Sequence, residues 1–566
     1  MTGRALALFK GEFPHTGRSY DVIIAPRALE SAVRTAGASF EALEDFVDPG
    51  SIEEAAQLLG ELARATFPDG TRVSRSRMYK GYELWWFSYD ELFYRECLPY
   101  TQYQRLFERL RDFSHVEVHH ASVAGLLHCY LDAYGVRHTF HGKPRSFPSL
   151  GIWLQAFVSL ISLPLLMLKR PGILLYTGDR FDPPRDHSFR LRLVYEELRA
   201  RKLPFAEFIR SLEPARTMFA HALKRRRPVI YSYALKVVLA WFSSLAGEHK
   251  LEARLPEPER QFRLALAATY LPRARAHAWM IALMHRIVRL VGFRAAFIAA
   301  ASSRTFHEVI ACKLARVPTV GILHGAASRY YNVYDFMPEY DGKARLGVDS
   351  YGVWSEGWKH YYLEHGRMYG AEQLPVSGPI RPLQGLERPA ASRDAQADPV
   401  KVLFVAGELS APEEVLPYMR ALMQTKGVSF YLTFRPYRDA FEAWLKEHEP
   451  ELLQSIPPER IFRGRRIQED IADCDVVVGS YSTAVLEALL QLKPAIFYRT
   501  KKWGDYFGMK EEGSMFFAEN PEELVERVRK SRDIPAQELK RLQERFFGDP
   551  QKNGSAWVVD ELEKML

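Results

Sequence analysis

The sequence predicts an α/β protein built on parallel sheets, and two stretches carry that prediction. Residues 401–530 alternate apolar, strand-like runs with helical runs at short spacing, which is typical of a parallel sheet with helices on both faces. Residues 295–323 show the same pattern, with a strand at 295–301, a helix at 305–315 and a strand at 318–323. Both stretches indicate βαβ units, in which ligands bind beyond the carboxyl ends of the strands.

The remaining elements are expected from shorter patterns. Residues 190–212, and the chain from there to about residue 292, are expected to be helical. A turn-rich polar stretch at 378–399 reads as a linker between domains. The other expected strands are 20–25, 173–177, 351–355 and 374–377, and the other expected helices are 29–35, 52–65, 358–365, 538–547 and 555–566.

The segment at 475–498 holds the most informative pattern of the chain. An apolar run ends in Gly479 and Ser480, a helical stretch begins at Ser482 and Thr483, and Lys493-Pro494 stops it before the next strand. Free N–H groups and hydroxyls at a helix start bind phosphate well. Glu487, one turn into the helix, is placed to accept hydrogen bonds from a ribose. The pattern therefore favours nucleotide binding, although any βαβ unit can carry such a turn.

These residues resemble the donor-binding half of GT-B glycosyltransferases, in which two Rossmann-like domains face each other. Three more stretches fit, at 320–325, 401–408 and 430–437, so the resemblance covers roughly residues 295–530. Their order is close to that of bacterial surface-polysaccharide enzymes, including the polysialyltransferase-like and CDP-glycerol transferase-like groups. Those enzymes often carry Arg-x-His-Pro where this chain has Arg435-Pro-Tyr-Arg438, which leaves the nucleotide base open.

The resemblance implies a donor site and, taken together with the apolar and basic segments of the N-terminal half, a domain plan. Residues 1–385 would form an N-terminal Rossmann-like acceptor domain with an apolar, basic helical insertion at about 148–292, lying in the membrane interface. Residues 386–398 would be the linker, and 399–566 the nucleotide-sugar-binding domain. The donor-contacting residues would be Gly407, Glu408, Arg435, Arg438, Ser480, Ser482, Thr483 and Glu487.

Two residues are candidates for acid–base catalysis. His324 ends a predicted strand before Gly325, and histidine is the side chain that titrates nearest neutral pH. Asp179 follows the strand at 173–177, and a carboxylate there is a candidate base. Both residues also have plain structural readings, His324 as a substrate-binding or structural histidine and Asp179 as a turn residue.

No metal and no cofactor are expected, because GT-B enzymes generally neutralise phosphate with helix starts and basic side chains. Asp473-Cys-Asp475 superficially matches a metal-binding motif but reads as a turn before a strand. His115, His119 and His120 lie near one strand, and they would bind a metal only if their ring nitrogens converged. The four cysteines lie far apart, which favours a reducing compartment over a disulfide framework.

The net charge of +8 is divided unevenly along the 566 residues. Residues 399–566 hold 24 Lys/Arg against 28 Asp/Glu, which leaves 53 against 41 of the totals for residues 1–398. The basic half also contains an uncharged run at 150–168 and the cluster Lys224-Arg-Arg-Arg227. We expect the run to lie in the interface of an anionic membrane. A buried core helix and a true membrane span are the alternatives.

The sequence thus predicts a glycosyltransferase that moves a sugar from a nucleotide sugar to a lipid-linked or growing surface glycan. It would be cytoplasmic and peripheral at the inner face of the plasma membrane, with no nucleic-acid partner. A CDP-polyol phosphotransferase, a sugar-nucleotide epimerase of the same fold and a non-catalytic membrane-associated scaffold are the rival readings. The N-terminal apolar stretch is too short for a signal peptide.

Overall fold

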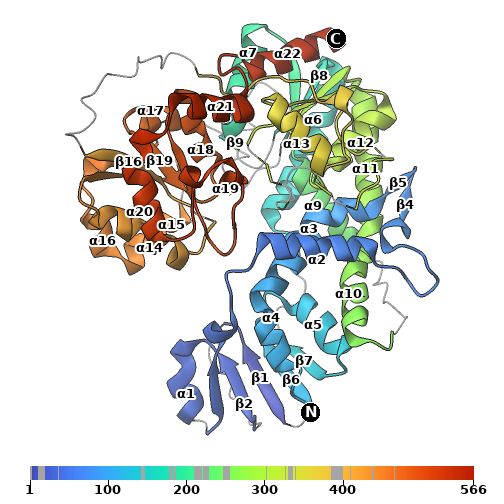
Figure 1. The fold of residues 1–566 in the computed structure, drawn as a ribbon. Helices are drawn as coiled ribbons and strands as arrows, with labels where there is room; N and C mark the ends of the chain where they lie inside the picture. Colours follow the sequence, from blue (N-terminus) through green and yellow to red (C-terminus); the bar gives the residue numbers. More distant parts are fainter. Residues whose placement is uncertain are drawn as a thin grey trace. The chain divides into compact units, whose positions relative to one another are not determined.

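In the part of the chain that it describes, the structure, a computed structural model, has three large sheets, two small antiparallel hairpins and the helices that connect them (Figure 1). It describes residues 3–10, 19–35, 37–141, 147–177, 181–182, 186–209, 220, 229–245, 255–300, 302–325, 327–328, 330, 336–337, 339–343, 345–383, 399–407, 409–435, 439–464 and 466–566.

The first sheet has five strands in the order β3-β2-β1-β6-β7, all parallel. Of the three strands of this sheet in residues 1–80, only β2 was expected from the sequence, and β1 and the partly exposed β3 were missed. The strands are β1 (Arg4–Leu8), β2 (Val22–Ala25), β3 (Ser39–Ala42), β6 (His115–His119) and β7 (Arg137–His141). The helices of this region are α1 (Glu30–Thr35), α2 (Ile52–Arg64), α3 (Tyr89–Leu92), α4 (Leu98–Leu110) and α5 (Ala124–Ala133).

The second sheet has the order β12-β11-β8-β13-β14-β15. The prediction of helix through 190–212 is wrong at its end, because the buried run Phe205–Ile209 forms strand β11 beside β8. A short apolar run fits a buried strand or a helix equally well, and pairing with β8 decides between them. The other strands are β8 (Ile173–Thr177), β12 (Val229–Ile230), β13 (Ala295–Ile298), β14 (Thr319–Ile322) and β15 (Ser350–Gly352).

The helices around the second sheet include one very apolar helix, α6 (Leu150–Lys169). The others are α7 (Arg192–Ala200), α9 (Ser232–Ser244), α10 (Pro258–Ala268), α11 (Leu271–Val291), α12 (Phe306–Ala315) and α13 (Glu356–His365). The strand expected at 374–377 is reduced to an isolated bridge between Val353 and Val376. The two hairpins are β4 (Met78–Tyr79) with β5 (Tyr82–Glu83), and β9 (Phe181–Asp182) with β10 (His187–Ser188).

The third sheet has the order β18-β17-β16-β19-β20-β21, again parallel. Its strands are β16 (Val400–Val405), β17 (Val428–Thr433), β18 (Ile461–Phe462), β19 (Val476–Gly479), β20 (Ala495–Tyr498) and β21 (Phe517–Ala518). Its helices are α14 (Pro412–Gln424), α15 (Ala440–His448), α16 (Pro450–Gln454), α17 (Ile467–Ala472), α18 (Thr483–Leu486), α19 (Met509–Glu512) and α20 (Pro521–Arg529). The predicted α/β class with parallel sheets is therefore confirmed.

The chain divides into two compact units that differ from the expected domain plan. One holds residues 1–189, 204–319 and 337–347, and the other holds 190–203, 320–336 and 348–566. Within the second unit the C-terminal helices α21 (Ala536–Phe547) and α22 (Gly554–Met565) pack on α13 and α7 (Figure 1). Arg201 fixes the latter contact, since its Nη1 lies 2.6 Å from both Asp560 and Glu563 carboxylate oxygens. The boundaries at 385 and 399 stay a prediction, because the linker at 386–398 lies outside the described residues.

Candidate functional site

The third sheet has a topological switch point between β16 and β19. Three successive strands, β16 to β18, extend to one side, and the next three, β19 to β21, extend to the other. The strand order therefore reverses between β16 and β19, and ligands of open parallel sheets bind beyond the carboxyl ends of the strands at such a point. Gly407 lies just after β16 and Ser480 just after β19, so two of the predicted donor-binding residues come together here.

The loops after β16 and β19 approach closely because residue 407 is a glycine. A Cβ atom added to Gly407 would lie 3.3 Å from Ser480 Oγ and 3.3 Å from a ring carbon of Tyr481. The two loops are also joined directly, since Ser410 Oγ lies 3.2 Å from Ser480 Oγ and Leu409 N donates to Tyr481 Oη at 2.9 Å. Tyr481 in turn stacks on Trp503 with ring centroids 4.0 Å apart. The sequence pattern named Gly407 and Ser480, but it missed Tyr481.

The helix after Ser480 is shorter than predicted. Ser482 caps it by accepting a hydrogen bond from Ala484 N at 3.3 Å, but α18 ends after a single turn and continues as a 3-10 helix from Glu487 to Gln491. Leu492 then adopts a left-handed backbone conformation before Pro494. A single turn has a small dipole, so the start of α18 at Thr483 supplies less positive potential than a full helix would. If a phosphate binds here, cationic side chains supply more of the charge that neutralises it.

Glu487 is buried and already has protein partners. Arg381 Nη2 donates to Glu487 Oε1 at 2.6 Å, and Gln468 Nε2 donates to Oε2 at 2.8 Å. The carboxylate was predicted to accept hydrogen bonds from a ribose. The contacts give it a further role, because they hold the guanidinium group of Arg381 beside Glu487.

His324 lies just beyond the carboxyl end of β14 and is surrounded by positive charge. Arg190 Nη1 lies 3.0 Å from His324 Nε2. Burial, helped by the charges of Arg190 and Arg381, lowers the pKa of His324 to about 3. The expectation that His324 titrates near neutral pH is therefore wrong in this arrangement, because desolvation and like charge both oppose protonation. The neutral ring accepts a hydrogen bond from Arg190 and holds that side chain in place.

Several cations of the second unit were not singled out from the sequence. Arg190 and Arg381 both help to lower the pKa of His324, and Lys502, whose own pKa is lowered by burial, donates to Leu409 O at 2.8 Å. Arg435, which was predicted, follows β17, and its backbone N–H donates to Asp439. Only the folded chain brings together residues so distant in sequence, so no local pattern signals Arg190 or Lys502.

Several predicted residues lie outside the described part of the chain. These are Asp179, Glu408, Arg438 and the cluster at 224–227. Asp475 is described, and its Oδ2 accepts from Lys401 N at 3.0 Å and from Arg532 Nη2 at 3.2 Å. These contacts lie ahead of β19, at the opposite end of that strand from Ser480, and agree with the reading of Asp473-Cys-Asp475 as a turn.

Helix α6 of the first unit has its apolar side turned outward. Its buried residues include Gln155, Ser159 and Ser162, and Ser159 Oγ accepts from Tyr231 N at 2.8 Å. Among the described helices it alone is long and apolar enough to cross a membrane, and only 28% of it is buried. The alternative of a buried core helix therefore does not hold. The exposed apolar residues of α6 are Leu150, Leu154, Phe157, Leu160, Ile161, Leu165, Met167 and Leu168.

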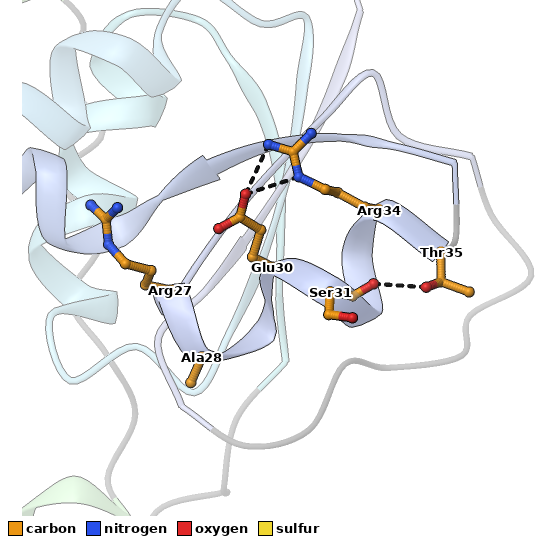
Figure 2. A pocket seen from close by; sticks show the side chains of 6 residues that line it. All are labelled: Arg27, Ala28, Glu30, Ser31, Arg34 and Thr35. Carbon is orange, nitrogen blue, oxygen red and sulfur yellow. Dashed lines mark hydrogen bonds and ion pairs between the residues drawn. The ribbon is translucent and has the colours of Figure 1, made fainter.

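A shallow hollow on the first unit lies along α1 and is not part of the candidate site. Figure 2 shows its lining residues Arg27, Ala28, Glu30, Ser31, Arg34 and Thr35. Arg34 Nε donates to Glu30 Oε1 at 2.9 Å, and Thr35 Oγ1 donates to Ser31 O at 2.8 Å (Figure 2). These are ordinary pairs four residues apart on one helix, so the hollow is a helix face with its polar groups already paired.

Comparison with known proteins gives only distant likenesses. No protein-family model and no curated protein matches the sequence. Among solved structures, UDP-bound S. aureus MnaA is 12% identical with a TM-score of 0.38, covering 69% of this chain and 96% of that one. Anabaena Alr3699/HepE with UDP and glucose is 14% identical with a TM-score of 0.38, covering 70% and 100%. Acinetobacter baumannii MurG is 12% identical with a TM-score of 0.40, covering 70% and 100%. At these scores the likenesses carry no functional argument, which rests on the side chains above.

Proposed function

We propose that this protein is a GT-B glycosyltransferase that moves a sugar from a nucleotide-sugar donor to a lipid-linked or growing surface glycan. The observation that carries the proposal is the close approach of Gly407 to Ser480 at the point where the third sheet reverses its strand order. A glycine there lets the backbone approach a ligand, and the neighbouring hydroxyls of Ser480 and Ser410 can hydrogen-bond it.

In this proposal cationic side chains of the second unit neutralise the donor phosphates. Transfer breaks the bond between the sugar carbon and the phosphate oxygen, and the nucleotide leaves with the negative charge. Arg381, fixed by Glu487, and Arg190, held by His324, are placed to stabilise that charge without a metal ion. Arg435 follows β17 and Lys502 follows β20, and in this proposal both add positive charge at the donor phosphates.

The new bond forms from an acceptor hydroxyl, whose proton must go to a base if the reaction inverts. His324 is a poor base with a pKa of about 3. Asp179 stays the candidate base, on the sequence argument that it follows strand β8.

The proposal places the protein at the cytoplasmic face of a membrane that contains anionic lipid. A helix of a soluble protein turns its polar residues outward, and α6 does the reverse. Phe147 and Phe242 are exposed beside Trp153 and Trp241, with ring centroids of Phe147 and Trp241 4.9 Å apart. Aromatic groups of this kind favour the level of the lipid head groups.

The orientation of α6 favours a position in the plane of the interface over a membrane span. One side of α6 packs along α9 and β12, so a spanning position would carry those elements into the bilayer too. Lys169 and Arg170 are exposed at its C-terminal end, where they can reach anionic head groups.

Three rival hypotheses share either the proposed fold or the membrane-binding surface with this proposal. A sugar-nucleotide epimerase would convert its donor without an acceptor, and a CDP-polyol phosphotransferase would bind CDP in preference to other nucleotides. A membrane scaffold would bind no nucleotide. The outward apolar side of α6 favours an enzyme with a membrane-borne acceptor over an epimerase.

The first test is a thermal-shift panel with UDP, GDP, CMP and CDP. We expect one of them to raise the unfolding temperature, since a ligand at a hundred times its Kd stabilises by about 2.7 kcal/mol. The nucleotide that does so identifies the base. If none raises the unfolding temperature, the proposed function is wrong, and the scaffold reading gains.

A further inference from the structure

The strongest feature outside the donor site lies at the carboxyl edge of the first sheet. Its strand order, β3-β2-β1-β6-β7, reverses between β1 and β6, as the order of the third sheet does between β16 and β19. His119 ends β6 and His141 ends β7. The two histidines are direct neighbours in the parallel pairing of these strands.

Glu117 completes a group of three side chains on one face of this sheet. It precedes His119 by two residues on β6, so both side chains point to the same face. Glu117 Oε1 lies 2.7 Å from His141 Nε2 and 3.9 Å from His119 Nε2. One ligand atom from each of the three residues lies within 4.8 Å of the others.

The group has an orphaned nitrogen that an ordinary hydrogen-bond network leaves unexplained. His119 is buried, and within the described residues its Nε2 has no hydrogen-bond partner. Leaving a buried polar atom without a partner costs free energy. A cation between His119 Nε2 and Glu117 would satisfy that nitrogen.

Tyr20 supports the carboxylate from the far side. Its hydroxyl donates to Glu117 Oε2 at 2.8 Å, which leaves Oε1 facing the two histidines. Metal-binding carboxylates are commonly oriented in this way by a second hydrogen bond. The side chain of Glu117 is buried while that of His141 is 43% exposed, so the group opens to solvent on the His141 side.

We propose that Glu117, His119 and His141 bind a divalent first-row transition metal, of which zinc is the best fit. Two imidazoles and one carboxylate are a common three-residue ligand set for Zn²⁺, with metal–ligand distances of about 2.0–2.2 Å. Tetrahedral ligands at that distance lie roughly 3.5 Å apart, so small side-chain rotations close the site. The fourth position faces solvent.

This proposal departs from the expectation of no metal, which considered the histidines of residues 115–120 without a partner from another strand. The missing ligand, His141, comes from the neighbouring strand, 22 positions beyond His119. The proposal is independent of the nucleotide site, because none of the three residues belongs to the unit that contains Gly407 and Ser480.

The test uses full-length protein without a histidine tag, stripped with chelator and titrated with Zn²⁺ and Co²⁺. We expect one equivalent of metal to bind, with visible Co²⁺ absorption bands of a low-coordinate site. His141→Ala should abolish this binding, and His141 is exposed enough for the variant to fold. Tyr20→Phe should weaken binding by about 10–100-fold. The control is His360→Ala, which removes an 83% exposed histidine of α13 and should bind like wild type.

Two results would overturn the proposal. One is wild-type protein that takes up no stoichiometric Zn²⁺ or Co²⁺. The other is His141→Ala protein that binds either metal as tightly as wild type. Nucleotide binding measured on the same samples shows whether the donor site is intact, so failure of the metal site and failure of the proposed function remain distinguishable.

Discussion

Arg190 Nη1 lies 3.0 Å from His324 Nε2, and this contact adds to the effect of burial in opposing protonation of the histidine. Burial, with Arg190 and Arg381 nearby, lowers the pKa of His324 to about 3 from an ordinary value of 6.5. The unfolded chain therefore binds more protons than the folded one between those two values, so this residue makes stability fall as the pH drops through that window.

The first prediction follows from the direction in which stability changes with pH. Replacing His324 with Asn removes one buried, neutral histidine, so the urea midpoint of the variant should fall less between pH 7 and pH 5 than that of wild type. Some slope should remain, because burial also lowers the pKa of His277 and His307. An unchanged slope in His324→Asn would mean that the pKa of His324 is not lowered.

The second prediction concerns the two catalytic candidates. Asp179→Asn should reduce turnover by roughly 10²–10⁴-fold with little change in donor affinity, as expected for loss of a general base. The pH dependence of wild-type turnover should show no inflection near pH 6.5 that arises from His324. His324→Asn should therefore leave the shape of the profile unchanged. If Asp179→Asn retains a near-full rate, or if His324→Asn abolishes such an inflection, the assignment of the base is wrong.

The third prediction concerns the contact between Arg381 and Glu487. Glu487→Ala should weaken nucleotide binding while the protein still folds, because Arg381 loses the carboxylate that positions it. Arg381→Ala should weaken binding too, and the double variant should lose less than the sum of the two single losses. Isothermal titration of all four proteins measures the coupling.

A matched ion pair in the same unit serves as the control. Arg420 Nη2 lies 2.7 Å from Glu449 Oε2. The side chain of Arg420 is exposed to a similar degree as that of Arg381, 47% against 41%. Arg420→Ala and Glu449→Ala should leave nucleotide affinity unchanged. If the losses of nucleotide affinity in Arg381→Ala and Glu487→Ala are strictly additive in the double variant, Glu487 does not position Arg381.

The fourth prediction concerns chelation. Because cationic side chains replace a metal at the donor phosphates in this account, turnover should persist in EDTA. Loss of turnover that magnesium or manganese restores would contradict the metal-independent mechanism. Loss that only zinc restores, and that His141→Ala reproduces, would instead link activity to the site at Glu117.

The fifth prediction concerns α6. Replacing Leu154, Phe157, Leu160 and Ile161 with Ser should release the protein from anionic vesicles in a flotation assay, because the variant loses much of the apolar side that inserts into lipid. High salt should release wild type only partly, since screening weakens attraction to lipid charge and leaves apolar insertion intact.

The control variant removes exposed apolar residues elsewhere, Val47→Ser with Leu363→Ser, whose side chains are exposed by 38% and 39%. It should float with vesicles as wild type does. Wild-type protein that stays in solution with anionic vesicles at low salt would refute the membrane reading.

The sequence was a good guide where local pattern and topology agree. The strands at 401–405 and 476–479 have apolar runs followed by Gly or Ser, so both strands followed from their pattern, and the resemblance singled out Gly407 and Ser480 after them. The prediction of helix at residues 205–209 was wrong for a physical reason. A five-residue apolar run does not specify helix or strand until a neighbouring strand pairs with it.

The site residues that were missed depend on contacts between distant parts of the chain. Arg190 reaches His324 across 134 positions, and Arg381 reaches Glu487 across 106. The pKa of His324 and the pairing of Glu487 depend on these arginines, and no spacing rule in one sequence can specify them. The same reason hid the approach of His141 to Glu117.

The most direct test of the central claim is equilibrium titration of Gly407→Val with the nucleotide that the thermal-shift panel selects. Gly125→Val is the control, since a Cβ at Gly125 meets no atom within 4 Å. The account predicts that Gly407→Val binds at least about tenfold more weakly than wild type, a loss of about 1.4 kcal/mol, and that Gly125→Val binds normally. A Gly407→Val protein that folds and binds the nucleotide as tightly as wild type would contradict a donor site between β16 and β19.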